Sequence, residues 1–182
     1  MLSGMSKITK ELEKEQKRFE EVLATSNKVI RLSAQLVTAL HSGNKLLEKK
    51  LAKELESEVS KLRKIEKGFE YYSMQAHQEY VEALAFKSVK EKGALPSSKE
   101  LEEKSIPYLL GIMDLVGELK REALDELRKG DKKKALSYYE LMKEIYDSTL
   151  HMRFANSLLP NFRKKQDVAR IQLESILELL SK

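Results

Sequence analysis

The sequence predicts an all-α protein, a single domain that forms a bundle of long helices, about six to seven in number at ordinary helix lengths. Its 182 residues include only 7 Gly and 3 Pro, so few positions force a helix to end. Lys, Glu, Leu and Ala, which favour helices, are abundant. No stretch alternates apolar and polar residues over the length of a β-strand, so strands are not expected.

Apolar residues recur every three or four positions through most of the chain, which is the spacing of an amphipathic helix. The pattern breaks at HSGN (41–44), at Gly93 and Pro96, and at NSLLPN (156–161). The expected helices are therefore Ser6–Leu40, Asn44–Lys92, a short helix capped by Ser97 and Glu100, Ser105–Lys129, Asp131–Ala155 and Asn161–Leu180. Residues 1–5 are expected to be disordered or foreign to the native chain, and residues 1–182 are treated as one domain.

The composition excludes several classes of protein. The chain has no cysteine, which rules out a cysteine nucleophile, a thiolate zinc site and disulfides, and agrees with a cytoplasmic location. No apolar run approaches the roughly 18 residues of a membrane span, and no phosphate-binding glycine loop is present. The net charge of +5, from 34 basic and 29 acidic residues, permits a nucleic-acid partner without requiring one.

The segment 71–86, YYSMQAHQEYVEALAF, carries far less charge than the rest of this highly charged chain. Its only charged residues are Glu79 and Glu82, and it contains neither Lys nor Arg. The two glutamates are three positions apart, so on a helix they share one face.

A second segment, 105–117 (SIPYLLGIMDLVG), has the same character. Its only charged residue is Asp114, and Glu118 follows the segment directly. The spacing of four positions again places both carboxylates on one helical face. Gly111 and Gly117 lie close to that face and would allow a second helix to approach. Four carboxylates could therefore converge from two packed helices.

Buried carboxylates without basic neighbours are costly unless they take up protons or a cation compensates their charge. Two facing carboxylate pairs form an all-oxygen site, which suits Mg²⁺ or Mn²⁺ better than Zn²⁺ or Cu²⁺. A metal held in this way can lower the pKa of a bound water and orient a phosphodiester.

Plainer interpretations remain open for the same residues. The Glu79 and Glu82 pair could be a solvent-facing stripe, and Asp114 could be a structural carboxylate satisfied by hydrogen bonds. We interpret His77 as a surface or interface residue, and the basic runs 132–134 and 163–165 as solvated faces. Similar acidic pairs stand among Lys and Arg and are also expected to be solvated: Glu100 with Glu103, Glu122 with Asp125, and Glu144 with Asp147.

Segments of the sequence resemble the translin/Trax family. QEYVEALAF at 78–86 and PYLLGIMDLVGELKREAL at 107–124 are similar to the signature segments of Trax. KVIRLSAQLVTALHSGN at 28–44 resembles the first helix of the family and its turn, and LRKGDKKKALSYYELMKEIYDS at 127–148 resembles the segment after the signature. The resemblance extends from about residue 20 to the C-terminus.

The resemblance implies a fold, an activity and a site. Trax subunits are metal-dependent endoribonucleases, whereas translin subunits lack the full acidic set and mainly bind RNA and DNA. Carried over by position, the catalytic and metal-binding carboxylates are Glu79, Glu82 and Asp114, with Glu118 as a further acidic member. All four are present, so the chain resembles Trax, as a compact prokaryotic or archaeal-type member. Family members assemble into hollow octamers, which implies a homo-octamer here if no translin partner exists.

We therefore expect a Mg²⁺- or Mn²⁺-dependent endoribonuclease that cleaves single-stranded or loosely paired RNA inside a hollow oligomer. The main alternative is a non-catalytic, translin-like oligomer that binds single-stranded RNA or DNA, and a purely structural oligomer is a third. The sequence suggests Lys120 and Arg121 as contacts for the nucleic-acid backbone, because they follow the second acidic pair closely. No membrane partner is expected.

Overall fold

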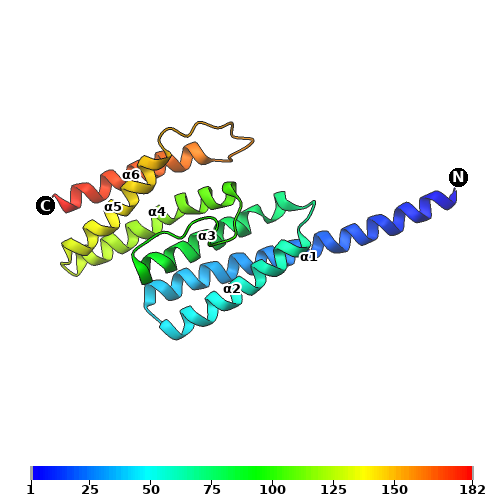
Figure 1. Cartoon of the computed structure of the whole chain (residues 1–182), viewed down its shortest axis with the longest axis horizontal. Helices are drawn as coiled ribbons and strands as arrows, with labels where there is room; N and C mark the ends of the chain where they lie inside the picture. Colours follow the sequence, from blue (N-terminus) through cyan, green and yellow to red (C-terminus); the bar gives the residue numbers. More distant parts are fainter. Residues whose placement is uncertain (1, 182) are drawn as a thin grey trace. The chain divides into compact units, whose positions relative to one another are not determined.

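The computed structural model describes residues 2–181, with side chains from residue 4 onward, and this part of the chain consists of α-helices and loops (Figure 1). Six helices follow one another: α1 (Leu2–Ser42), α2 (Lys45–Ile65), α3 (Glu70–Lys92), α4 (Ser105–Arg128), α5 (Lys132–Thr149) and α6 (Phe162–Leu180). The predicted all-α fold is confirmed. No helix within residues 2–181 is both long and apolar enough to span a membrane.

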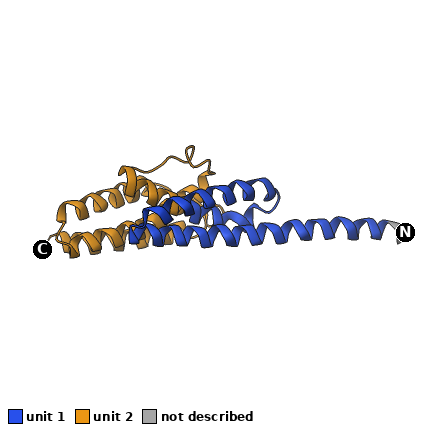
Figure 2. Ribbon diagram, turned by 90° about the horizontal axis from the view of Figure 1, so that it is seen from below, with its two compact units in different colours: residues 1–80 blue, residues 81–182 orange. Residues whose placement is uncertain are grey.

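The chain divides into two compact units, residues 1–80 and residues 81–182 (Figure 2). The boundary falls inside α3, so the first part of this helix belongs to unit 1 and the rest to unit 2.

Unit 1 is organised by the packing of α1 against α2. Gly43, with φ of +69°, forms the turn between them in a conformation that disfavours other residues. Asn44 then caps α2, since its side chain accepts a hydrogen bond from the backbone N–H of Leu47 at 3.1 Å. Apolar residues spaced by three and four positions are buried along both helices: Val22, Val29, Leu36, Leu40, Leu51, Leu55, Val59 and Leu62.

The sequence predicted one helix from Asn44 to Lys92, and this prediction is wrong. The helix is interrupted between Ile65 and Glu70, where Gly68 has φ of +88°. A single glycine inside a helix lowers its stability by only about 1 kcal/mol relative to alanine. The sequence pattern therefore could not show whether Gly68 lies within a continuous helix or at a corner between two helices.

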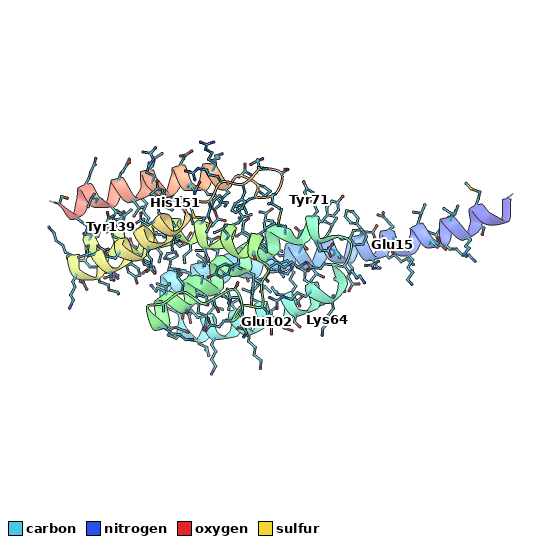
Figure 3. All side chains as sticks on the ribbon, turned by 45° about the horizontal axis from the view of Figure 1, so that its top comes forward. Glu15, Lys64, Tyr71, Glu102, Tyr139 and His151 are labelled. Carbon is cyan, nitrogen blue, oxygen red and sulfur yellow. The ribbon has the colours of Figure 1, made fainter. Side chains whose placement is uncertain are left out.

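Glu66 holds this corner together. Its carboxylate, on a residue only 6% exposed, accepts a hydrogen bond from Ser73 Oγ at 2.5 Å and lies 2.8 Å from His77 Nε2. The interpretation of His77 as a surface or interface residue is therefore wrong, because its ring is buried within the chain and joined to Glu66. At the same corner Tyr71 is 79% exposed and lies at the surface, as does Glu15 on α1 (Figure 3).

Unit 2 is built around α4, which packs against both α5 and α6, while α5 and α6 also pack against each other. The part of α3 in this unit and α4 run in the same direction, and the segment 93–104 returns between their ends (Figure 1). The core of unit 2 contains mainly aliphatic side chains: Leu110, Leu115, Leu119, Met142, Ile145, Leu173 and Ile176.

Several predicted helix ends in unit 2 are confirmed and others are corrected. Gly130, with φ of +83°, ends α4, and the Asp131 side chain caps α5 by accepting from the Lys134 N–H at 2.9 Å. Ser97 and Glu100 form the predicted capping-box hydrogen bonds, but only turns follow them. The N-cap of α4 is Lys104, not Ser105.

The prediction is wrong for the end of α5 and holds for α6. The predicted end of α5 at Ala155 is wrong, since the helix stops at Thr149. There Gln166 on α6 donates a hydrogen bond to the Thr149 carbonyl at 2.6 Å. Asn161 precedes α6 as predicted, with φ of +58°.

Candidate metal and nucleic-acid site

An ion pair joins α3 to α4 within unit 2. Lys90 Nζ lies 2.6 Å from a Glu122 carboxylate oxygen, and these residues are 32 positions apart. Glu82 and Asp114 are separated by the same 32 positions. The two helices run in the same direction, so Glu82 on α3 and Asp114 on α4 each lie eight positions before the residue that forms this ion pair.

Asp114 and Glu118 are half-buried and lie one turn apart on α4. Both neighbours of Asp114, Met113 and Leu115, are buried, so the carboxylate stands at the edge of an apolar face. Its side chain remains 25% exposed. A carboxylate in this position is partly desolvated yet accessible, as a ligand for a cation must be.

Glu79 lies in a different compact unit from the other three candidate carboxylates. It is half-buried on α3, one turn before Glu82, and belongs to unit 1, whereas Glu82, Asp114 and Glu118 belong to unit 2. The spacing of Glu79 and Glu82 on one continuous helix agrees with the shared face that the sequence predicted.

A lysine that the sequence did not associate with the site contacts Asp114. Lys165, at the start of α6, pairs through its ammonium with Asp114 Oδ1, and the two side chains are 21% and 25% exposed. The expectation of an acidic site without basic neighbours is therefore wrong. The interpretation of 163–165 as a solvated face is also wrong for Lys165, which is withdrawn from water beside Asp114. The local sequence around Lys165 does not show that α6 packs on α4.

The donors match a hard cation, but their present arrangement does not enclose one. The candidate ligands are all carboxylates, which suits Mg²⁺ or Mn²⁺. Among residues 2–181, however, no group of three or more His, Asp or Glu side chains is positioned to hold a metal ion. Metal binding at these residues would require Asp114 to exchange its contact with Lys165 for a contact with the metal.

The acidic stripe continues along α4 beyond Glu118. Glu122 and Glu126 follow at intervals of four, and each residue is only 4% exposed. The expectation that Glu122 is solvated is wrong, because Lys90 on α3 neutralises it inside the protein. The lysine lies 32 positions away, so the local charge pattern gave no sign of it.

Glu126 is neutralised from within unit 2 as well. Lys134 Nζ lies 2.9 Å and Lys129 Nζ 3.1 Å from its Oε1. The hydrogen bond from Lys134, against the opposing effect of burial, holds the pKa of Glu126 below its ordinary value. Burial raises the pKa of the neighbouring Tyr138 hydroxyl to about 12, and Glu122 and Glu126 add to the shift.

The six helices define an all-α protein with half-buried carboxylates on α3 and α4. The profile of the translin family matches residues 4–179, and the chain belongs to this family. The resemblance drawn from the signature segments is confirmed.

Individual relatives agree with this assignment. An uncharacterized protein of Methanocaldococcus jannaschii, MJ0175, is 31% identical over 159 residues, which are 85% of this chain and 71% of the relative. The crystal structure of apo-NeC3PO is similar with a TM-score of 0.91 at 25% identity, covering 99% of this chain and 97% of that one. The structure of AfC3PO in complex with duplex RNA has a TM-score of 0.88 at 29% identity, covering 97% and 94%.

Proposed function

We propose that the chain is a Mg²⁺- or Mn²⁺-dependent endoribonuclease that cleaves single-stranded or loosely paired RNA inside a hollow homo-oligomer. The observation that supports the proposal is the ion pair between Lys90 and Glu122, whose separation of 32 positions equals that of Glu82 and Asp114. The chain also belongs to the translin family, and the solved relative AfC3PO is described in complex with duplex RNA.

In this proposal Glu79, Glu82, Asp114 and Glu118 hold the metal. When bound, such a metal acidifies a water molecule and balances the charge that develops on the phosphate oxygens. The side chain of Asp114 is only 25% exposed, and this partial desolvation strengthens the electrostatic interactions of its carboxylate. In the absence of a metal, Lys165 compensates the charge of Asp114.

The proposed oligomer agrees with the exposure of α1. Every described side chain from residue 4 to residue 17 is exposed. Met5, Ile8 and Leu12 are spaced along one stripe and are 61%, 49% and 64% exposed. Such a stripe is expected to be covered by another copy of the chain, and the octamer itself rests on the family resemblance. We place the protein in the cytoplasm, in line with its lack of cysteine.

The test is cleavage of labelled RNA by the wild type with Mg²⁺, Mn²⁺ or EDTA, using a single strand, a loosely paired hairpin and a duplex. The duplex is included because AfC3PO is described in complex with duplex RNA. The proposal predicts cleavage that depends on the metal and stops with EDTA. Equal cleavage in EDTA, or none with either metal, would overturn it.

A specific observation supports the non-catalytic alternative, which is a translin-like oligomer that binds single-stranded RNA or DNA. Lys165 already satisfies the charge of Asp114, and no group of three metal-binding side chains is formed within residues 2–181. This alternative predicts nucleic-acid binding without metal that survives both Glu79→Gln and Asp114→Asn, with no cleavage under any condition.

A further inference from the structure

A surface pocket of about 340 Å³ lies along α4, beginning directly before Glu118. It is lined entirely by residues of this helix: Gly117, Lys120, Arg121, Leu124, Asp125 and Arg128. All of them belong to unit 2. The pocket therefore shares its helix and its unit with the carboxylates of Asp114 and Glu118.

The charge of this pocket is positive and only partly compensated. Arg128 pairs with Asp125 at 2.8 Å, and both side chains are well exposed. Lys120 is half-buried and Arg121 is exposed, and neither makes an ion pair or a side-chain hydrogen bond within residues 2–181. Two basic groups thus stand side by side in a pocket with no acidic partner of their own.

The shape of the pocket leaves room at its end nearest the carboxylates. Gly117 has no side chain, and a Cβ built there would meet only Gln172 Nε2 on α6, at 3.6 Å. Gly117 lies nearly one turn after Asp114, and Arg121 lies one turn further. At about 1.5 Å per residue, the Arg121 position is about 10 Å along the axis from the Asp114 position.

We propose that this basic pocket binds backbone phosphates of the RNA strand next to the bond that is cut. The inference rests on the proposed function and assigns its substrate contacts. The guanidinium of Arg121 can donate two parallel hydrogen bonds to one phosphate, and the ammonium of Lys120 can bind a neighbouring phosphate of the same strand. A strand held at Lys120 and Arg121 passes close to Glu118 and Asp114, so the pocket positions the strand and the carboxylates act on it.

The experiment measures binding of a labelled RNA by fluorescence anisotropy in EDTA, where cleavage is absent, over roughly 50 to 300 mM salt. The variant is Lys120→Gln with Arg121→Gln. The matched control is Lys132→Gln with Lys133→Gln, which removes the same charge from exposed residues of α5 that have no ion pair within the described chain. Melting temperatures of both variants verify that the fold is intact.

We expect the Lys120 and Arg121 variant to bind RNA at least about tenfold more weakly at low salt. The slope of log affinity against log salt should become shallower by about 1.4, because each single-strand phosphate that is no longer neutralised reduces it by about 0.7. The control should change the affinity by less than about threefold. In the cleavage assay with metal, KM should rise in the variant while kcat stays close to that of the wild type.

Equal weakening by the two double variants would overturn the inference, because the effect would then reflect net charge alone. Unchanged binding by the Lys120 and Arg121 variant would overturn it as well. If the wild type cleaves RNA in either case, the proposed function stands and only the pocket assignment fails. If the wild type neither binds nor cleaves RNA, both fail.

A competition arm identifies what the pocket recognises. Inorganic phosphate at about 10 mM should displace little RNA, since an isolated phosphate spans only one of the two contacts. An abasic ribose-phosphate oligomer should compete nearly as well as RNA, because backbone contacts carry no sequence information. Failure of the abasic oligomer to compete would contradict recognition of the backbone.

Discussion

The ammonium of Lys165 at the start of α6 pairs with the carboxylate of Asp114 in the middle of α4. Both side chains are largely withdrawn from water, so the pair is more than a solvated surface contact. Asp114 is also an essential ligand of the proposed metal site. The protein therefore carries its own cation beside the carboxylate that would bind a metal.

Removing this cation should strengthen metal binding. In Lys165→Gln the carboxylate of Asp114 keeps its charge and loses its competitor, so we expect Mn²⁺ to bind about tenfold more tightly, a change of about 1.4 kcal/mol. Isothermal titration with Mn²⁺ in the absence of RNA measures the effect. Lys164→Gln is the matched control, because Lys164 is the exposed neighbour of Lys165 and makes no ion pair within the described residues.

Two failures of this titration have different meanings. If the wild type binds Mn²⁺ through Asp114 and Lys165→Gln binds it no better, the lysine does not compete with the metal. If the wild type shows no Mn²⁺ binding that Asp114→Asn abolishes, the metal site itself is wrong.

The ion pair between half-buried Lys90 and buried Glu122 should hold α3 to α4. Lys90→Met leaves a buried carboxylate without its cation, and we expect the free energy of unfolding to fall by about 3 kcal/mol. Lys87→Met is the control, since it breaks the more exposed pair with Glu91 on the same helix and should cost less than about 1 kcal/mol. Urea denaturation measures both changes.

The double variant Lys90→Met with Glu122→Leu distinguishes a missing attraction from an uncompensated charge. Replacement of both partners by apolar side chains should restore much of the stability that the single variant loses. A double variant less stable than Lys90→Met alone would contradict this explanation.

Tyr138 should make the protein sensitive to alkali. Burial raises the pKa of its hydroxyl to about 12, above the value of about 10 in an unfolded chain. A raised pKa favours the protonated form in the folded state. Its contribution to stability is thus complete below about pH 10 and is lost as the pH rises from about 10 to about 12.

Urea denaturation at several values of pH in that range, on the wild type and on Tyr138→Phe, measures the contribution of Tyr138. The phenylalanine variant cannot ionise there, so its stability should fall less steeply than that of the wild type. Lysines titrate in both proteins and cancel in the comparison. Parallel curves would show that Tyr138 does not carry the effect.

The sequence predicted those features that depend on local pattern. Helical spacing and the scarcity of glycine and proline predicted the all-α fold, and the low charge around Glu79, Glu82 and Asp114 marked two half-buried acidic faces. Carboxylates that recur at helical spacing without lysines nearby can be recognised from the sequence alone.

The features that the sequence did not predict depend on contacts between distant helices. Lys165 and Lys90 each neutralise a carboxylate more than thirty positions away, and helical periodicity does not say which helix a given face meets. The corner at Gly68 was missed for a different reason. It is stabilised by the buried carboxylate of Glu66 with Ser73 and His77, which are not adjacent to it in sequence.

Single-turnover cleavage by Asp114→Asn, at a Mn²⁺ concentration that saturates the wild type, tests whether Asp114 belongs to a metal-dependent site that cuts RNA. Asp167→Asn, an exposed residue of α6, is the control. We expect Asp114→Asn to cleave RNA at least about a hundredfold more slowly than the wild type while it still binds RNA in EDTA. Cleavage by Asp114→Asn within about threefold of the wild-type rate would show that Asp114 is not part of such a site.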